Sequence, residues 1–271
     1  MIRVELVKLL RRPRTWVTIA MLNALPTLVA VLLALTDIGP RPGTGPPFLS
    51  AVLTDGTLFP LAALAIVLPL FLPVAVAVIG GEAIAGEAQT GTLRYLLVRP
   101  VGRTRLIVAK MVSVVAFVLL AVVVVAVVGY VVGQLLLGDG DPSGAVASVS
   151  GTSLDSTQIA QRTLLALGYV TLSMLGVAAL ALLLSTFTDS AIGAALGTVA
   201  FLVASTVLLG LDAADALQPW LPTRYWLAFV DLFRDPILWR DVVRGVLLQG
   251  AYLLVFLGAA WANFTTKDVT S

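Results

Sequence analysis

The sequence predicts an all-α, polytopic membrane protein with six transmembrane helices and both termini in the cytoplasm, and three observations predict this class. The first is composition, because 59% of the 271 residues are hydrophobic and only 12% are charged, whereas soluble domains carry about 25% charged residues. The second is length, because six charge-free intervals contain 22 to 28 residues each and a membrane-spanning helix needs about 20. These intervals are 15–36, 56–81, 111–138, 163–188, 190–211 and 245–266.

The third observation is the distribution of charge between the intervals. With the N-terminus inside, the cytoplasmic segments carry a net charge of +6 and the outer segments −4, which together give the +2 of the whole chain. An excess of Lys and Arg on the cytoplasmic side is what the positive-inside rule predicts. We expect the first interval to be a span and not a signal peptide. It exceeds the roughly 7–15 residues of a signal-peptide core, and no small-residue cleavage site follows it.

We therefore expect a single transmembrane domain over residues 1–271. Its spans are predicted at about 15–36, 57–80, 111–136, 163–186, 190–211 and 245–265. Arg outnumbers Lys by 14 to 3, and Ala, Val and Gly abound, which is typical of a GC-rich bacterial genome. The expected location is thus a bacterial cytoplasmic (inner) membrane.

Residues 1–14 predict a short amphipathic helix that ends at Pro13 and lies on the inner membrane surface. Its apolar residues recur at helical spacing, and the basic residues Arg11, Arg12 and Arg14 stand at its end. These arginines either bind anionic lipid headgroups or serve only as topology anchors. The sequence leaves both interpretations open.

Two features of the spans concern their shape and packing. Proline removes a backbone donor and clashes with the preceding turn, so the first two spans are predicted to be kinked. In the fifth span Gly193 and Gly197 stand four residues apart, a spacing that permits close approach of another helix in the same chain or in a second copy. The prolines are Pro26 in the first span and Pro60, Pro69 and Pro73 in the second.

The last outer segment, residues 212–243, combines aromatic residues with charges of both signs. Aromatic residues at this density favour the membrane–water interface. Pro222 and Pro236 divide the segment. We predict two interfacial or partly re-entrant helices that cap the outer face.

Several classes of chemistry are excluded by missing residues. The chain has no Cys and no His, which removes disulfides, thiol chemistry, Cys-based metal sites and the commonest general base. None of the three lysines follows a Gly, so the chain lacks a phosphate-binding G-x-x-x-x-G-K-[ST] loop. We expect no catalytic residue, cofactor site or metal site in this chain, and no nucleic-acid partner.

The loop after the second span, residues 82–105, is predicted to be a cytoplasmic coupling segment. Leu93, Leu96 and Leu97 line one side of a short helix that ends near Arg99, because Pro100 disfavours helix at the preceding residue. A loop that only fixed the topology would need its arginines but no apolar ridge. The pattern therefore favours a helix that docks against another protein.

This loop resembles the corresponding loop of type-2 permeases of the ATP-binding-cassette (ABC) family. The likeness extends weakly to the basic N-terminal helix, the six spans and an outer Pro-Thr-Arg-Tyr segment at residues 222–225. Ala88-Gln89 departs from the Arg-Glu pair frequent in that family, so a salt bridge from those positions is not expected. The matching residues are Gly86-Glu87, Gly91-Thr92-Leu93, Leu96-Leu97, Pro100-Val101-Gly102-Arg103 and Lys110.

The resemblance implies the membrane subunit of an ATP-driven exporter. Such a subunit pairs with a second copy or a paralogue and docks two separate ATPase subunits, which bind ATP and Mg²⁺. Its leucines would supply the buried contact and its charged residues would orient the partner. The implied coupling residues are Glu82, Glu87, Gly91, Thr92, Leu93, Arg94, Leu96, Leu97, Arg99, Pro100 and Arg103.

The apolar spans favour a hydrophobic or amphipathic cargo, such as a small molecule, a lipid or a peptide. Two other classes stay open. A secondary transporter would need no ATPase, although ion-coupled carriers usually keep ionisable groups inside the membrane and these spans have no carboxylate. A non-transporting scaffold or sensor would show no substrate-dependent turnover. An enzyme acting within the membrane lacks a base or metal site.

Overall fold

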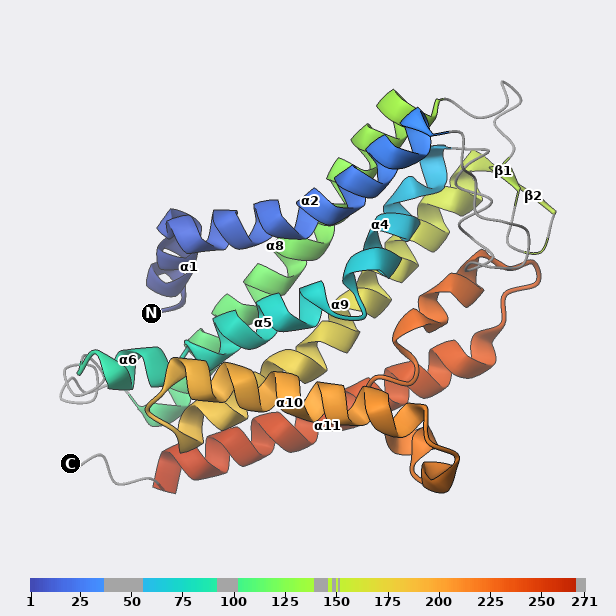
Figure 1. Cartoon of the computed structure of the whole chain (residues 1–271). Coiled ribbons are helices and arrows are strands. Elements are labelled where there is room, and N and C mark those ends of the chain that lie inside the picture. Colours follow the sequence, from blue (N-terminus) through green and yellow to red (C-terminus); the bar gives the residue numbers. More distant parts are fainter. Residues whose placement is uncertain (37–55, 92–101, 139–145, 148–149, 151, 267–271) are drawn as a thin grey trace.

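The chain folds into a bundle of long helices (Figure 1) in the computed structural model, which describes residues 1–36, 56–91, 102–138, 146–147, 150 and 152–266. The N-terminal half contains α1 (Ile2–Arg11), α2 (Pro13–Leu35), η1 (Gly56–Leu58), α4 (Phe59–Val67), α5 (Phe71–Gly81), α6 (Ala85–Gln89) and α8 (Arg103–Leu137). The C-terminal half contains β1 (Val146–Ala147), β2 (Ser153–Leu154), α9 (Ser156–Phe187), α10 (Ala191–Leu209), η2 (Asp212–Ala214), η3 (Gln218–Trp220), η4 (Trp226–Phe233) and α11 (Trp239–Thr266).

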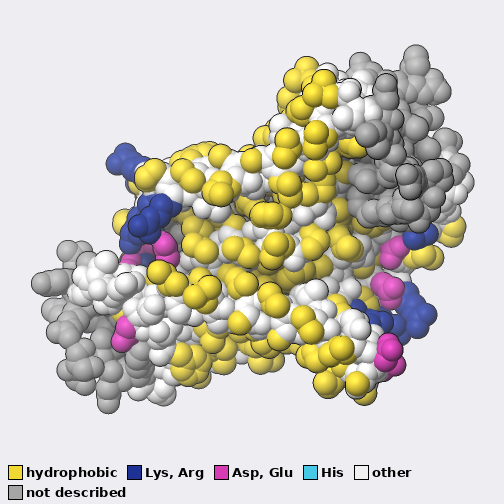
Figure 2. Space-filling view, viewed as in Figure 1, with side chains coloured by type: hydrophobic (Ala, Val, Ile, Leu, Met, Phe, Trp, Pro, Cys, Tyr) yellow, Lys and Arg dark blue, Asp and Glu magenta, His cyan; other side chains and the backbone are white. Residues whose placement is uncertain are grey.

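Helices of membrane-spanning length confirm a multi-pass α-helical membrane protein. Five described helices are long and apolar enough to cross a bilayer, and the bent pair formed by η1–α4 and α5 makes up to six. Within the described ranges, the one exception to helical secondary structure is a minimal antiparallel pairing of β1 with β2. In Figure 2 apolar side chains cover the middle of the visible face, while charged side chains gather towards its two ends.

Helix α8 begins at Arg103, eight residues before the predicted start of the third span, and α9 begins at Ser156, seven before the predicted fourth. A charge-free interval marks only the part of a helix that suits hydrocarbon. The helix can extend beyond that interval where hydrogen-bond partners satisfy the backbone groups at its end. At α9 a capping box supplies this, with Asp155 and Gln158 each bonding to the backbone of the other.

The long helices alternate in direction, so the same few segments gather at each end of the bundle (Figure 1). Helices α1 and α6, the start of α8 and the last turn of α11 lie at one end, which we call the α6 end. The β pairing and η2 to η4 lie at the other. Arg103 Nη1 joins the start of α8 to the last turn of α11, because it donates to the carbonyl oxygen of Thr265 at 2.9 Å.

The proline-rich interval 56–81, predicted as the second span, is kinked as expected. Helices α4 and α5 meet at 60° across residues 68–70. Pro26 has a milder effect, since α2 continues through it and changes direction along its length in Figure 1.

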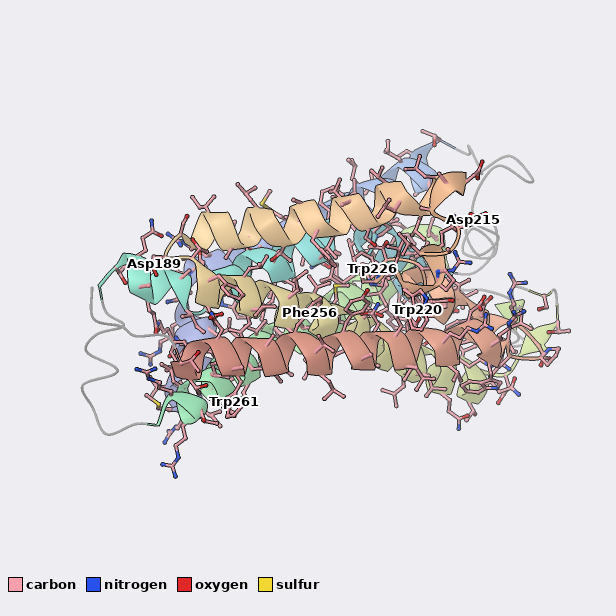
Figure 3. The ribbon with its side chains drawn as sticks, turned by 90° about the horizontal axis from the view of Figure 1, so that it is seen from below. Asp189, Asp215, Trp220, Trp226, Phe256 and Trp261 are labelled. Atoms are coloured by element: carbon pink, nitrogen blue, oxygen red, sulfur yellow. The ribbon has the colours of Figure 1, made fainter. Side chains whose placement is uncertain are left out.

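The outer segment 212–243 differs from the two interfacial helices predicted. Residues 212–238 contain three short 3₁₀ helices, and α11 already begins at Trp239. Helix η4 is buried among α9 and α11, with Phe229 fully buried and Trp226 4% exposed. Trp220 stays exposed (Figure 3). A high density of aromatic residues therefore indicates a buried core as well as a membrane interface, because the same residue types occur in both environments.

Side-chain donors from the spans hold this segment through its backbone carbonyl groups. Tyr169 of α9 donates to the carbonyl oxygen of Tyr225 at 2.6 Å. Gln249 and Tyr252 of α11 donate to those of Pro222 and Trp220, at 2.7 and 2.6 Å. Bonds of this kind satisfy the polar backbone of irregular chain that packs against the bundle.

Small residues let α5 approach α10 closely. A Cβ atom placed on Gly81 would lie 2.9 Å from the backbone nitrogen of Ala195 and 3.1 Å from the carbonyl oxygen of Ala191. The predicted pair lies in the same helix: Gly193 is exposed, and a Cβ atom placed on Gly197 would lie 3.2 Å from the Leu184 side chain of α9. A role of Gly193 and Gly197 in contact with a second copy stays a prediction.

Replacing Gly81 tests this packing. We expect Gly81→Ala to lower the free energy of unfolding by about 1–3 kcal/mol, because the added methyl group meets backbone atoms that cannot rotate away. The matched control is Gly250→Ala in α11, where a Cβ atom meets nothing within 4 Å; it gains similar helix propensity without the clash. Thermal unfolding in detergent measures both, and equal midpoint temperatures would contradict the expectation.

Candidate functional site

The candidate site is the α6 end of the bundle, where a short helix follows the broken second span. A tight turn over residues 82–84 joins α5 to α6. Buried Ser185 of α9 fixes this turn, since its hydroxyl oxygen accepts the N–H groups of Ile84 and Ala85 at 3.1 and 2.8 Å. The same hydroxyl donates to the carbonyl oxygen of Gly81 at 2.7 Å. One side chain of α9 thus holds the whole turn.

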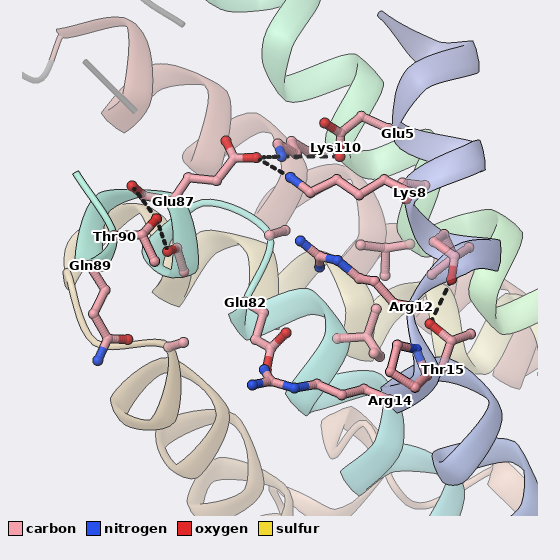
Figure 4. Close-up of a pocket in the computed structure, with 18 residues that line it drawn as sticks. Glu5, Lys8, Arg12, Arg14, Thr15, Glu82, Glu87, Gln89, Thr90 and Lys110 are labelled. Atoms are coloured by element: carbon pink, nitrogen blue, oxygen red, sulfur yellow. Dashed lines mark hydrogen bonds and ion pairs between the residues drawn. The ribbon is translucent and has the colours of Figure 1, made fainter. Parts of the chain in front are cut away.

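A buried carboxylate then joins α6 to two other helices (Figure 4). Glu87 of α6 is 7% exposed, and its Oε1 atom accepts from Lys8 Nζ of α1 at 2.8 Å and from Lys110 Nζ of α8. Lys110 is 3% exposed and also lies 3.1 Å from Glu5 Oε2. We call Glu5, Lys8, Glu87 and Lys110 the ion cluster.

The ion cluster keeps its charges because each buried group faces an opposite one. Burial by itself would raise the pKa of Glu87, but Lys110 and Lys8 attract the carboxylate and together bring that pKa below its ordinary value of 4.5. The cluster contains two lysines and two glutamates, so its formal charges balance. A buried charge without such partners would carry a large desolvation penalty.

A second ion pair is more exposed. Arg14 at the start of α2 donates to Glu82 at 3.0 Å, and the Arg14 side chain is 77% exposed. Arg14 and Arg12 line a cavity of about 640 Å³ between α1 and α6, together with the ion cluster (Figure 4). Arg11 is exposed at the end of α1.

Helix α1 is amphipathic, as predicted, and it also packs against this site. Leu9 is buried against the bundle, while Ile2, Val4 and Leu10 stay exposed. The chain turns at Arg12, as Pro13 predicted, and Thr15 donates to the carbonyl oxygen of Leu9 across the turn at 2.8 Å. This helix therefore belongs to the site and does not hang free of it.

The predicted coupling residues fall into two groups. Glu82, Glu87, Gly91 and Arg103 are described, and the three charged residues each form a side-chain bond within this chain. Gly91 has a φ of +70° with open space around it, so the chain leaves α6 through a conformation that favours glycine. The remaining residues lie outside the described part of the chain; they are Thr92, Leu93, Arg94, Leu96, Leu97, Arg99 and Pro100.

Several contributors were not predicted from the sequence. Glu5, Lys8 and Ser185 hold α6, and Asn263 of α11 donates to Thr186 at 2.8 Å near the end of α9. A charged residue at each border of an apolar run signals a membrane boundary, but does not say which residue it pairs with. Within the described ranges no cluster of three or more Asp or Glu side chains could hold a metal ion.

Comparison with known proteins adds a family without an activity. A family model described as protein of unknown function (DUF2705) matches residues 27–270. The match omits α1 and the first half of α2 and takes in the later long helices. No curated protein matches the chain.

Neutralising Glu87 should destabilise the α6 end strongly. In Glu87→Gln the buried Lys110 keeps only Glu5, and losing one partner of a buried ion pair costs about 3–5 kcal/mol. Glu82→Gln is the matched control and should cost under about 1 kcal/mol, because its partner is exposed. Thermal unfolding of the purified variants gives both values. The double variant Glu87→Gln/Lys110→Met should recover part of the loss; equal effects of the two single variants would refute the assignment.

Acid should weaken the same cluster. The pKa of Glu87 is lowered by folding, so its contribution to stability is present above the ordinary value of 4.5 and is lost as pH falls through the lower folded-state pKa. We expect the unfolding temperature of the wild type to fall in this acid range more than that of Glu87→Gln. Parallel pH profiles for the two proteins would show that Glu87 does not titrate as described.

Proposed function

We propose that this chain, which belongs to the DUF2705 family of unknown function, is the transmembrane subunit of an ATP-driven exporter in a bacterial cytoplasmic membrane. In this proposal it crosses the membrane six times, with the bent pair α4–α5 as the second crossing and both termini in the cytoplasm. Two subunits, identical or paralogous, form the pathway. Two separate ATPase subunits bind ATP and Mg²⁺ beneath them, and this chain catalyses no reaction itself.

The observation that carries the proposal is the attachment of α6. This five-residue helix is too short to be stable alone, yet four other elements hold it. It continues α5 in the chain, Ser185 fixes it to α9, and Glu87 fixes it to α1 and α8. A force applied to α6 is therefore applied to three membrane-spanning segments at once.

Such an attachment suits a device that transmits a conformational change. ATP favours the closed arrangement of the ATPase pair, and this preference reaches the spans only if the contact between them is rigid. In our proposal the buried charges of α6 serve rigidity within this chain. Contact with the ATPase then belongs to the segment that leaves α6 through Gly91, where the sequence places the leucine ridge.

Two further observations agree with this division of roles. The lysines of the chain lack the glycine-rich context of a phosphate-binding loop, so ATP hydrolysis is assigned to another chain. The apolar surface of the spans (Figure 2) suits a hydrophobic or amphipathic cargo, such as a small molecule, lipid or peptide. The resemblance of residues 86–110 to type-2 ABC permeases supplies the class of partner.

The test removes the predicted contact without touching the spans. Leu96→Asp should abolish substrate-stimulated ATPase activity of the complex and reduce co-purification of the ATPase subunit, because a buried leucine contact is worth about 2–5 kcal/mol. The matched control is Leu217→Asp, a 56% exposed leucine beyond the spans at the opposite end of the bundle. Both variants must insert in the membrane to wild-type levels.

Transport assays separate this proposal from the other classes. In sealed vesicles the complex should transport only with ATP. Transport driven by an ion gradient without nucleotide would indicate a secondary transporter, and the absence of any turnover with its ATPase would indicate a scaffold. Normal ATPase stimulation in Leu96→Asp would overturn the coupling role of the ridge.

A further inference from the structure

The break between α4 and α5 lies about midway between the two ends of the bundle. It occupies residues 68–70 and appears halfway along the second span in Figure 1. Two contacts with α8 bracket it: Gly129 packs against Pro60 on one side, and Lys110 pairs with Glu87 on the other. The break is thus level with the middle of α8, far from both ends of the bundle.

Backbone groups at this break are unpaired. The helical pattern runs to Leu68, whose N–H donates to the carbonyl oxygen of Leu64 at 2.9 Å, and resumes with Val74, which donates to Leu70 at 3.1 Å. Between them, Pro69 and Pro73 have no N–H to offer to the residues four positions earlier. The carbonyl groups of Ala65 and Pro69 therefore lose their helical donors. Among the described residues, the N–H group of Leu70, which precedes α5, also has no backbone acceptor.

The break is open to the surroundings of the chain. Pro69 is exposed, the Leu70 side chain is 51% exposed and that of Phe71 is 43% exposed. Hydrocarbon offers no hydrogen-bond partner, so non-helical backbone at this depth occurs where protein covers it or where water reaches it. A lipid-facing position for these residues conflicts with that constraint.

A second copy of the chain would be a poor cover. The large exposed side chains of the long helices are mainly apolar, including Leu28 of α2, Leu196 of α10 and Leu254 of α11. Polar side chains of the spans such as Asn23 and Thr206 donate to carbonyl groups of their own helices. Apolar side chains pressed against the break would leave its carbonyl groups without donors.

We propose that Pro69, Leu70 and Phe71 line a water-filled pathway through the membrane domain. Water donates to the free carbonyl groups and accepts from the free Leu70 N–H. The two prolines thus keep a hydrated position in an otherwise apolar span. This inference goes beyond the proposed function and requires only that the chain spans a membrane, so it holds or fails independently of any ATPase.

Cysteine labelling tests the proposal directly, because the natural chain has no Cys. Single variants Leu70→Cys and Phe71→Cys are reconstituted in sealed lipid vesicles and treated with a charged, membrane-impermeant methanethiosulfonate. The reagent needs a thiolate, which forms in water. The matched control is Val123→Cys in the middle of α8, with 46% exposure. We expect labelling at 70 and 71 to be at least about ten-fold faster than at 123.

The alternative results are equally definite. Labelling at 70 and 71 as slow as at 123 overturns the proposal. So does a disulfide between two copies of Leu70→Cys together with no labelling by the reagent, because that result places the break in a dry contact. Size-exclusion profiles matching the wild type confirm that each variant is folded.

A second variant tests whether water reaches the break because Pro73 has no N–H to donate. Pro73→Ala restores an N–H four residues after Pro69, so the Pro69 carbonyl can regain a helical partner. Combined with Leu70→Cys, it should slow labelling by about ten-fold or more. An unchanged rate would show that the proline-freed backbone does not hold the water, and would overturn this account.

Discussion

The α6 end of the bundle depends on one buried carboxylate shared by two lysines. Glu87 is the point at which α1, α6 and α8 meet, and the three helices come from parts of the chain up to about one hundred residues apart. Apolar side chains could fill the same volume with a smaller desolvation penalty, but they would let α6 slide along its neighbouring helices. An ion pair with fixed partners holds one register of α6 relative to the neighbouring helices.

Rigidity at α6 contrasts with the break halfway along the same span. Ser185 and the ion cluster fix the lower half, α5, to its neighbours at the α6 end, while residues 68–70 separate it from α4. Helix α4 packs on α8, and α5 packs on α9 and α10. The two halves of this bent pair therefore have different main neighbours, although α5 also contacts α8.

The sequence was sufficient for the features that depend on composition and on single residue types. Uninterrupted apolar intervals predict the long helices, and the prolines of the second interval predict its kink. It was insufficient where the outcome depends on a partner far along the chain. Lys8 and Lys110 both look like boundary charges, and only the packed bundle brings them to one carboxylate. Trp226 and Trp220 read alike in sequence, yet η4 carries one into the core and leaves the other exposed. The leucine ridge lies outside the described residues, so its docking role rests on pattern and resemblance.

The way in which the outer segment is held has a consequence for how this chain can diverge. Tyr169, Gln249 and Tyr252 donate hydrogen bonds to main-chain carbonyl oxygen atoms, which every amino acid carries. The residues whose carbonyl groups accept these bonds can therefore change identity as long as the backbone path is kept. Each donating side chain, in contrast, has few substitutes. A lineage could thus change the residues exposed at this end of the bundle while keeping the three side chains that hold it.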